Sequence, residues 1–311
     1  MRRSIALICV LVGSSLAWGQ ESESTSVTTR TSGGADLLSQ IWNFEDATPL
    51  NTGQLDLRLG GRWGTGQSLG DSSDDWLLTP SLVWGACEDV ELSLTVKAWL
   101  GDGGDVGPFE DGNYDTDLGV LWRLHEQTGF EHKEGYLHLP SIALSGTFRI
   151  PTGDGSEKID GELRLIMTYE YESGIRTHFN AWGKSANGDN FENISSDSFE
   201  DFDRSDIQTL ADAGVFGRGS DGLQTRDFQY GGVIGADGPL CADGAVRWVA
   251  DYMYSTSAWD GFSFHHIGEV GFEWEISDAS KFGLSVQANL DRNDSQHDWG
   301  AGVMYSYTIG S

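Results

Sequence analysis

The chain has 311 residues, and its 19 Lys and Arg against 48 Asp and Glu give a net charge of -29. Such an acidic chain is a poor partner for nucleic acid, because phosphate contacts need clustered Lys and Arg. The 12 Trp, 14 Phe and 9 Tyr argue against disorder. No stretch approaches the roughly 20 apolar residues of a membrane-spanning helix.

The first 52 residues carry no strand pattern. Met1-Arg2-Arg3, the apolar run 5–12 and the small residues that follow are typical of a secretory signal peptide, which we expect over 1–20. Residues 21–52 begin rich in Ser and Thr, and we expect a flexible periplasmic N-terminal arm there. Within it, 37–42 has the apolar spacing of one short amphipathic turn.

From residue 53 to 311 one pattern repeats, in which about ten residues of strict apolar–polar alternation precede each turn or loop. Successive side chains of a strand point to opposite faces, so each stretch predicts a two-faced strand. Ile166 and Trp182 are exceptions, because they are apolar residues on the polar face. The candidate strands cover 53–63, 75–85, 89–100, 115–124, 139–150, 160–171, 174–183, 226–237, 244–255, 263–275, 280–290 and 298–308.

The connections alternate in length. After even-numbered strands they are mostly short, whereas after odd-numbered strands they are longer and acidic, up to the loop 184–225. Short periplasmic turns, longer external loops and an even strand count are typical of bacterial outer-membrane barrels. We therefore expect an all-β fold, a closed antiparallel transmembrane β-barrel of about 12 strands, in contact with outer-membrane lipid. An exported soluble β-domain is the alternative, and its apolar strand faces would form a core.

If the apolar faces meet lipid, the polar faces line the lumen. Two interpretations stay open for the charged residues there. Basic side chains can select anionic solutes, as charged rings do in channels, or they can pair with acids on neighbouring strands and fill the lumen. The candidate lumen-lining residues are Arg58, Lys97, Arg123, Arg149, Arg164, Arg176, Arg247, Glu269, Glu273 and Lys281.

Acidic clusters lie in the predicted external loops, at 102–105, 110–117 and 200–206. Carboxylates are ligands for Ca²⁺, so these loops are candidate sites for divalent cations, with plain solvated loops as the alternative. His265, His266 and Glu269 lack the further His or Cys that zinc sites usually have. We expect lumen lining there, and neither a metal site nor a cofactor.

Catalytic patterns are weak. The stretch 66–70 matches Gly-x-Ser-x-Gly, but it falls in a predicted loop and no helix follows it. His178 and Asn180 share a strand face without a well-placed Ser, so we expect no enzyme. Cys87 and Cys241 lie in separate predicted turns, and a disulfide would require those turns to meet.

The stretch 146–154 ends in Pro151, Thr152, Gly153 and Asp154. A strand running into Pro-Thr-Gly-Asp, together with the turn Trp84-Gly85 and the residues after it, resembles the outer-membrane family labelled "putative MetA-pathway of phenol degradation". Pro151 ends a strand because it has no N–H to donate, and Gly153 permits a tight turn. The resemblance implies a barrel that passes small, aromatic molecules, and it carries no catalytic residues.

The sequence therefore predicts an outer-membrane barrel that acts as a passive channel for a small solute, either aromatic or anionic. The alternative is a plugged surface barrel with a binding or structural role.

Overall fold

The computed structural model describes residues 42–68, 71–101, 116–127, 139–152, 159–185, 228–242, 244–256, 265–290 and 299–310. No helix among them is both long enough and apolar enough to cross a membrane. The signal peptide, residues 21–41 and the acidic clusters at 102–105, 110–115 and 200–206 lie outside these ranges.

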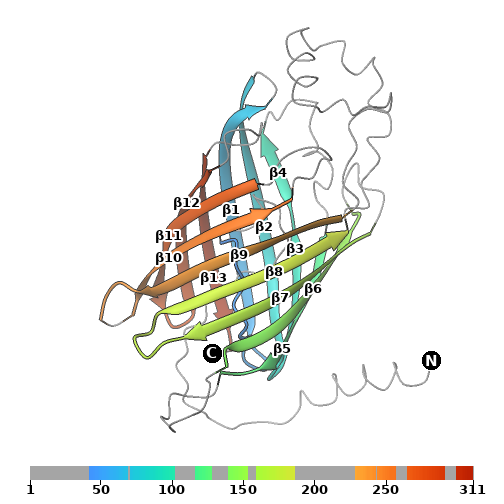
Figure 1. Cartoon of the computed structure of the whole chain (residues 1–311). Helices are drawn as coiled ribbons and strands as arrows, with labels where there is room; N and C mark the ends of the chain where they lie inside the picture. The colour runs from blue at the N-terminus through green and yellow to red at the C-terminus, as the bar shows by residue number, and fades with distance from the viewer. Residues whose placement is uncertain are drawn as a thin grey trace, which may run out of the picture.

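The described strands form one closed antiparallel barrel (Figure 1). Strands pair with their neighbours along the chain except at β4, which pairs with β2 while β3 pairs with β5. β1 also pairs with β13, which closes the sheet. In chain order the strands are β1 (Leu55–Ser68), β2 (Asp71–Cys87), β3 (Val90–Val96), β4 (Ala98–Gly101), β5 (Thr116–His125), β6 (Ser141–Ile150), β7 (Asp160–Glu170), β8 (Arg176–Ser185), β9 (Phe228–Pro239), β10 (Val246–Ser255), β11 (His265–Ser277), β12 (Ser280–Asn289) and β13 (Trp299–Ile309).

β3 and β4 are two pieces of one barrel strand, because both pair with β2 and only Lys97 separates them. Counted this way the barrel has twelve strands, as predicted. The interruption was not expected within the candidate strand 89–100. It lies opposite Pro80 of β2, between the pairs Ser81–Thr95 and Leu78–Ala98. Proline has no N–H to donate, so the ladder breaks beside it.

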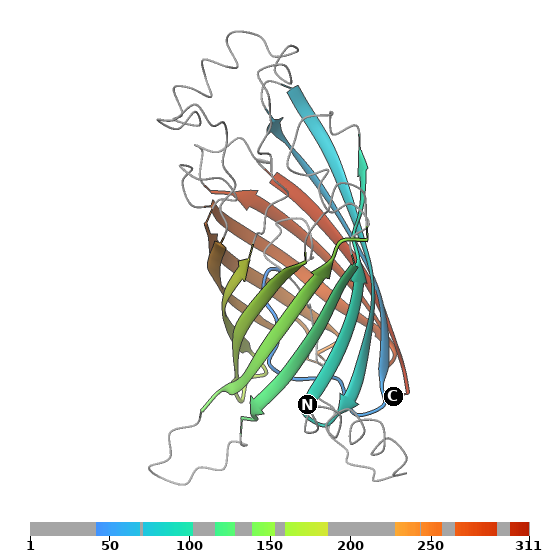
Figure 2. The same ribbon diagram turned by 90° about the vertical axis from the view of Figure 1, so that its right-hand side faces the viewer.

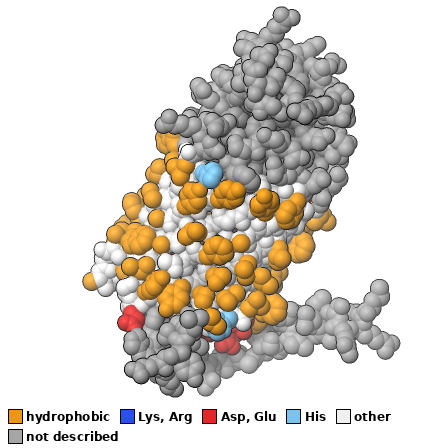
Figure 3. Space-filling model, in the orientation of Figure 1, with side chains coloured by type: hydrophobic (Ala, Val, Ile, Leu, Met, Phe, Trp, Pro, Cys, Tyr) orange, Lys and Arg blue, Asp and Glu red, His pale blue; other side chains and the backbone are white. Residues whose placement is uncertain are grey.

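The barrel carries its apolar residues outside and its polar residues inside. On β7, Leu163 is 61% exposed, whereas its neighbour Arg164 is 2% exposed. The same alternation spreads large hydrophobic side chains over the outer surface (Figure 3). In water such a surface would be strongly unfavourable, and in lipid it is the expected one. The alternative of an exported soluble β-domain is therefore wrong, because the apolar strand faces form no core.

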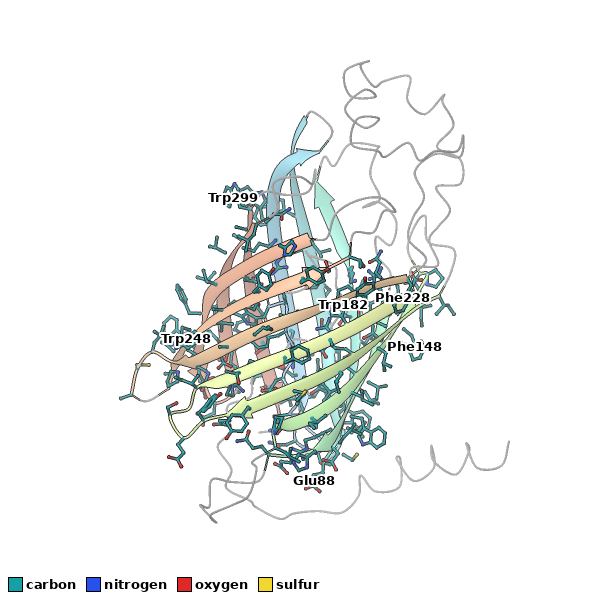
Figure 4. The ribbon with its side chains drawn as sticks, viewed as in Figure 1. Glu88, Phe148, Trp182, Phe228, Trp248 and Trp299 are labelled. Carbon is teal, nitrogen blue, oxygen red and sulfur yellow. The ribbon has the colours of Figure 1, made fainter. Side chains whose placement is uncertain are left out.

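The two ends of the barrel differ. Glu88, in the short turn between β2 and β3, and Trp299, at the start of β13, mark opposite ends (Figure 4). The short connections β7–β8, β9–β10 and β11–β12 lie at the same end as Glu88. Gly53, just before β1, donates its N–H to the carbonyl of Gly85 at this end. The first strand therefore begins, and the last strand ends, at the end of the barrel with the short turns.

Residues 42–52, which we call the lumen segment, belong to no strand; 42–50 lie inside the barrel, and Asn51 and Thr52 are exposed (Figure 2). Trp42 and Ala47 are 1% and 0% exposed, and Phe44 is buried as well. Gly85 allows the main chain of the segment to pass close to the wall, since a Cβ atom there would lie 2.1 Å from the carbonyl oxygen of Asn51. The prediction of a flexible arm over 21–52 is thus wrong for 42–52, because partners on the barrel wall hold this stretch.

Candidate functional site

The predicted lumen-lining residues all lie on the inner face of the barrel. Lys97, Arg123, Arg164, Arg176, Glu269 and Glu273 are buried there. The side chains of Arg58, Arg149, Arg247 and Lys281 also point inward and keep only a small exposed fraction. That these inward side chains line a path for a solute stays a prediction.

The basic residues of the lumen are paired with carboxylates. Lys97, between β3 and β4, pairs with Asp117 of β5, with Nζ 3.2 Å from Oδ2. Other pairs lie within one strand, as Arg164 and Glu162 do at 3.1 Å. Further pairs among the described residues include Arg58–Asp56, Arg123–Asp89, Arg149–Asp117, Arg176–Asp237, Arg247–Asp237 and Lys281–Glu273. These ion pairs agree with the interpretation that acids and bases of the lumen pair with one another along the wall.

The family-like turn motif lies away from these pairs. Pro151 and Thr152 directly follow β6, and the Oγ1 atoms of Thr152 and Thr116 are 2.9 Å apart at the strand ends. Gly153 and Asp154 lie outside the described residues. A functional role for the motif stays a prediction.

The lumen segment is the part of the site that the sequence did not reveal. Near its start, the side-chain amide of Asn43 donates to Asp251 Oδ1 at 2.8 Å and to Glu269 Oε2 at 2.9 Å. The Asn43 main-chain N–H also donates to Asp251 Oδ2 at 3.2 Å. Glu269 in turn accepts from Arg62 Nη2 at 2.7 Å, and Arg62 is a lumen residue absent from our prediction. One amide thus joins two buried carboxylates of different strands.

Further along, wall side chains bind the main chain of the segment. Asn180 accepts the Glu45 N–H at 2.6 Å and donates to the Glu45 carbonyl at 3.1 Å, as a neighbouring strand would. Thr168 Oγ1 accepts the Ala47 N–H at 3.1 Å, and Glu91 Oε2 accepts the Leu50 N–H at 2.9 Å. A buried N–H without a partner is costly, so these side chains make the buried path of the segment possible.

A charged cluster holds the middle of the segment. Asp46 Oδ2 accepts from Arg176 Nη1 at 2.7 Å. Arg176 also donates to Asp237, which accepts from Arg247 Nε at 2.6 Å. His178 Nε2 lies 2.7 Å from Asp237 Oδ1. The wall therefore presents two guanidinium groups and an imidazole around one aspartate, and the segment adds the second aspartate.

Two apolar clusters complete the fit. Trp42 and Phe44 pack with inward-facing Val233, Val249, Met253, Ile267 and Met304. Ala47 packs with Leu121, Ala143 and Ile166, so the apolar exception on β7 is a contact for the segment. Trp182, the other exception, is likewise buried on the inner face of β8. In the sequence, apolar residues on the polar strand faces were the one sign that apolar side chains of another segment fill part of the lumen.

Two further expectations concern metals and thiols. Among the residues that the structure describes, no group of three or more His, Cys, Asp and Glu is arranged to hold a metal ion. Glu269 faces the lumen, and the His265 side chain and the acidic loop clusters up to residue 115 are not described. Divalent-cation binding by those loops stays a prediction. Cys87 and Cys241 are both free thiols.

Comparison with known proteins bears on the fold. Neither a protein-family model nor a curated protein matches the chain. An outer membrane channel from Pseudomonas putida F1 has a similar structure, with a TM-score of 0.53 at 10% identity over 85% of this chain and 98% of that chain. The NanC porin, at a TM-score of 0.46 and 7% identity over 82% of this chain and 100% of its own, is too distant to carry an argument. With its apolar exterior and polar lumen, the protein is a β-barrel of the bacterial outer-membrane type.

Proposed function

We propose that this protein is a passive channel for a small solute in the bacterial outer membrane, and that residues 42–52 narrow its lumen. One observation carries the proposal, namely that the lumen houses a stretch of main chain together with a buried Trp and a buried Phe. Small barrels are usually filled by their own wall side chains. A lumen that admits a polypeptide segment has room for a small molecule when the segment moves.

The charges of the wall support passage of a polar or charged solute. Arg149, Arg164 and Lys97 face the lumen among carboxylates, so charged groups line the lumen beside the two apolar clusters. Transport across such a barrel needs no chemical step, and we propose no enzymatic activity. The family resemblance, which implies small aromatic molecules, points to solutes of the same size.

Swelling of proteoliposomes tests the proposal. Vesicles that contain the refolded mature protein are placed in small sugars or in sodium salts of small organic acids. We expect faster swelling than in vesicles without protein. A barrel that is folded, as its heat-dependent shift on a denaturing gel reports, but that leaves swelling at the empty-vesicle rate would contradict the proposal.

A second candidate rests on the same segment. If the bonds of residues 43–47 with the wall hold permanently, the protein is a plugged barrel with a binding or structural role at the surface. The swelling assay separates the two, because a permanent plug predicts no solute entry from a folded barrel.

A further inference from the structure

Phe44 and Asp46 present a planar ring and a carboxylate to adjacent groups of the barrel wall. The Phe44 ring stacks on the imidazole of His178, with centroids 4.2 Å apart and an angle of 17° between the planes. The Asp46 carboxylate meets Arg176 at 2.7 Å. His178 and Arg176 are two residues apart on β8, so both point into the lumen from one strand. The segment thus places on the wall the two chemical groups of an aromatic carboxylate.

Gly235 leaves space on the barrel wall for the Phe44 ring. Gly235 is the cross-strand partner of His178, and a Cβ atom at Gly235 would lie 2.5 Å from Phe44 Cδ1. The missing side chain on β9 therefore leaves a slot beside the imidazole that fits a flat ring. Offset or parallel stacking on an aromatic face contributes beyond simple apolar burial. We call the space between His178 and Gly235 the ring slot.

The imidazole of the ring slot is held from both sides. Ala47 donates its N–H to Thr168 Oγ1, and that hydroxyl lies 3.1 Å from His178 Nδ1. With Thr168 donating to Nδ1, the opposite nitrogen carries the proton and donates to Asp237 at 2.7 Å. The ring orientation is therefore fixed by wall residues, and an incoming planar group meets a pre-arranged face.

The charges of the wall leave a place for one carboxylate. Around Asp46 the wall contributes Arg176 and Arg247 against Asp237. Nearby, Lys281 and Glu273 lie 3.6 Å apart and add one charge of each sign. Asp46 brings this group to neutrality, and its withdrawal leaves one surplus positive charge beside the ring slot. A buried surplus charge favours a replacement anion, because charged groups in such surroundings need a partner.

The lumen segment is tethered at one end only among the described residues, through Gly53 and β1. The wall contacts its main chain through the side chains of Asn180, Thr168 and Glu91. Withdrawal of the segment toward the end with the short turns therefore requires no β-ladder to break. A solute that offers the same two groups can compete with Phe44 and Asp46 for the wall.

We infer that Arg176, His178 and Gly235 form a binding site for a small aromatic carboxylate, and that Phe44 and Asp46 occupy this site as an internal competitor until the solute displaces them. The inference rests on the proposed channel function and names its substrate class. Solute binding and opening are then one event, because a ligand that binds only the vacated wall shifts the population toward the open lumen.

Thiol modification tests the inference with benzoate as the probe. In a chain carrying Cys87→Ser, Cys241→Ser and Ala47→Cys, the introduced thiol is buried while the segment is in place. We expect benzoate to raise the modification rate in a saturable way. Cyclohexanecarboxylate, which lacks the flat ring, and benzyl alcohol, which lacks the charge, should raise it less. Equal acceleration by all three compounds, or none by benzoate, would overturn the inference.

Two variants make the test specific. Arg176→Gln in the same chain should raise the rate without probe by about ten- to a hundredfold, because a charge-assisted bond to Asp46 is lost, and benzoate should add little. Thr95→Val removes a part-buried hydroxyl that bonds Ser81, and it should respond to benzoate as the parent does. A benzoate response that survives Arg176→Gln, or disappears in Thr95→Val, would contradict the assigned site.

Ion current separates failure of this inference from failure of the channel function. With Phe44→Ala the ring slot is empty, and we expect benzoate to block the open current transiently, an effect that added Arg176→Gln abolishes. If folded barrels carry no current at all, the channel function is wrong, whereas the thiol assay still reports on the site. If they carry current but benzoate changes neither the current nor thiol modification, the binding site is wrong.

Discussion

At the scale of single residues, Asn43 connects the lumen segment to two strands. Its side-chain amide donates to Asp251 on β10 and Glu269 on β11. Removing it leaves two buried carboxylates with fewer donors, and hydrogen bonds to charged groups contribute about 1.5–3 kcal/mol each. The hold on the segment therefore depends strongly on this residue.

We predict that Asn43→Ala releases the segment. Cleavage by chymotrypsin after Trp42 or Phe44, followed by mass spectrometry, should become about ten- to a hundredfold faster in the folded barrel. Asn51→Ala is the matched control, because Asn51 is exposed and its described bonds involve its main chain. Equal cleavage of Asn43→Ala and the unaltered protein would show that this amide does not hold the segment.

Gly235 leads to a second prediction at this scale. An alanine Cβ there would lie 2.5 Å from Phe44 Cδ1, closer than real contacts allow, so Gly235→Ala should displace the ring while the barrel closes normally. Gly161→Ala is a control, since its Cβ would have only an ordinary 3.9 Å contact. We expect larger single-channel conductance for Gly235→Ala alone. Unchanged conductance would mean that Phe44 adapts within the slot.

At the scale of elements, the sequence predicted most of the strands and little of the lumen segment. Alternation defines a strand locally, so β7 and β12 could be read from 160–171 and 280–290 without knowledge of their partners. The β3–β4 break depends on Pro80 in the neighbouring strand, which a local pattern does not include. The lumen segment has no period of its own, because its partners are scattered over β3, β5 to β11 and β13.

Strand alternation also assigns the inward basic residues to the polar face, and it marks Ile166 as an apolar residue on that face. Ile166 shares a buried apolar cluster with Ala47, more than a hundred positions away in the chain, and no spacing rule connects them. The hydrogen bond from Asn43 to Asp251 in the lumen could not be predicted from the sequence for the same reason.

The apolar exterior predicts that a charge costs more in the middle of a strand than at its end. Leu284 lies in the middle of β12 and faces outward, whereas Ile309 faces outward at the end of β13. Leu284→Arg should lower the free energy of unfolding in lipid vesicles by about 2–4 kcal/mol, and Ile309→Arg by about 0–1 kcal/mol. Denaturant unfolding followed by Trp fluorescence measures both. Equal costs at the two positions would contradict the placement of this face against lipid.

At the scale of the whole molecule, the charges of the wall should set ion preference. Arg149 faces the lumen and pairs with Asp117, whereas Arg164 is more deeply buried and also donates to the Asn43 carbonyl. We predict that Arg149→Ser and Arg164→Ser, singly and together, shift the reversal potential in a salt gradient toward cation selectivity. Gln287→Ser, an uncharged inward change, should leave it unaltered. An unchanged reversal potential in the double variant would sink the idea that these residues select.

The central claim is that a conducting lumen is occluded by residues 42–52. Single-channel recording in planar bilayers tests it most directly, by comparing the mature protein with a variant carrying Asn43→Ala, Phe44→Ala and Asp46→Asn. These changes remove contacts of the segment with the wall and leave every β-ladder intact. We expect larger or longer-lived conductance steps in the variant. A folded variant whose conductance equals that of the unaltered protein would contradict occlusion of the lumen by residues 42–52.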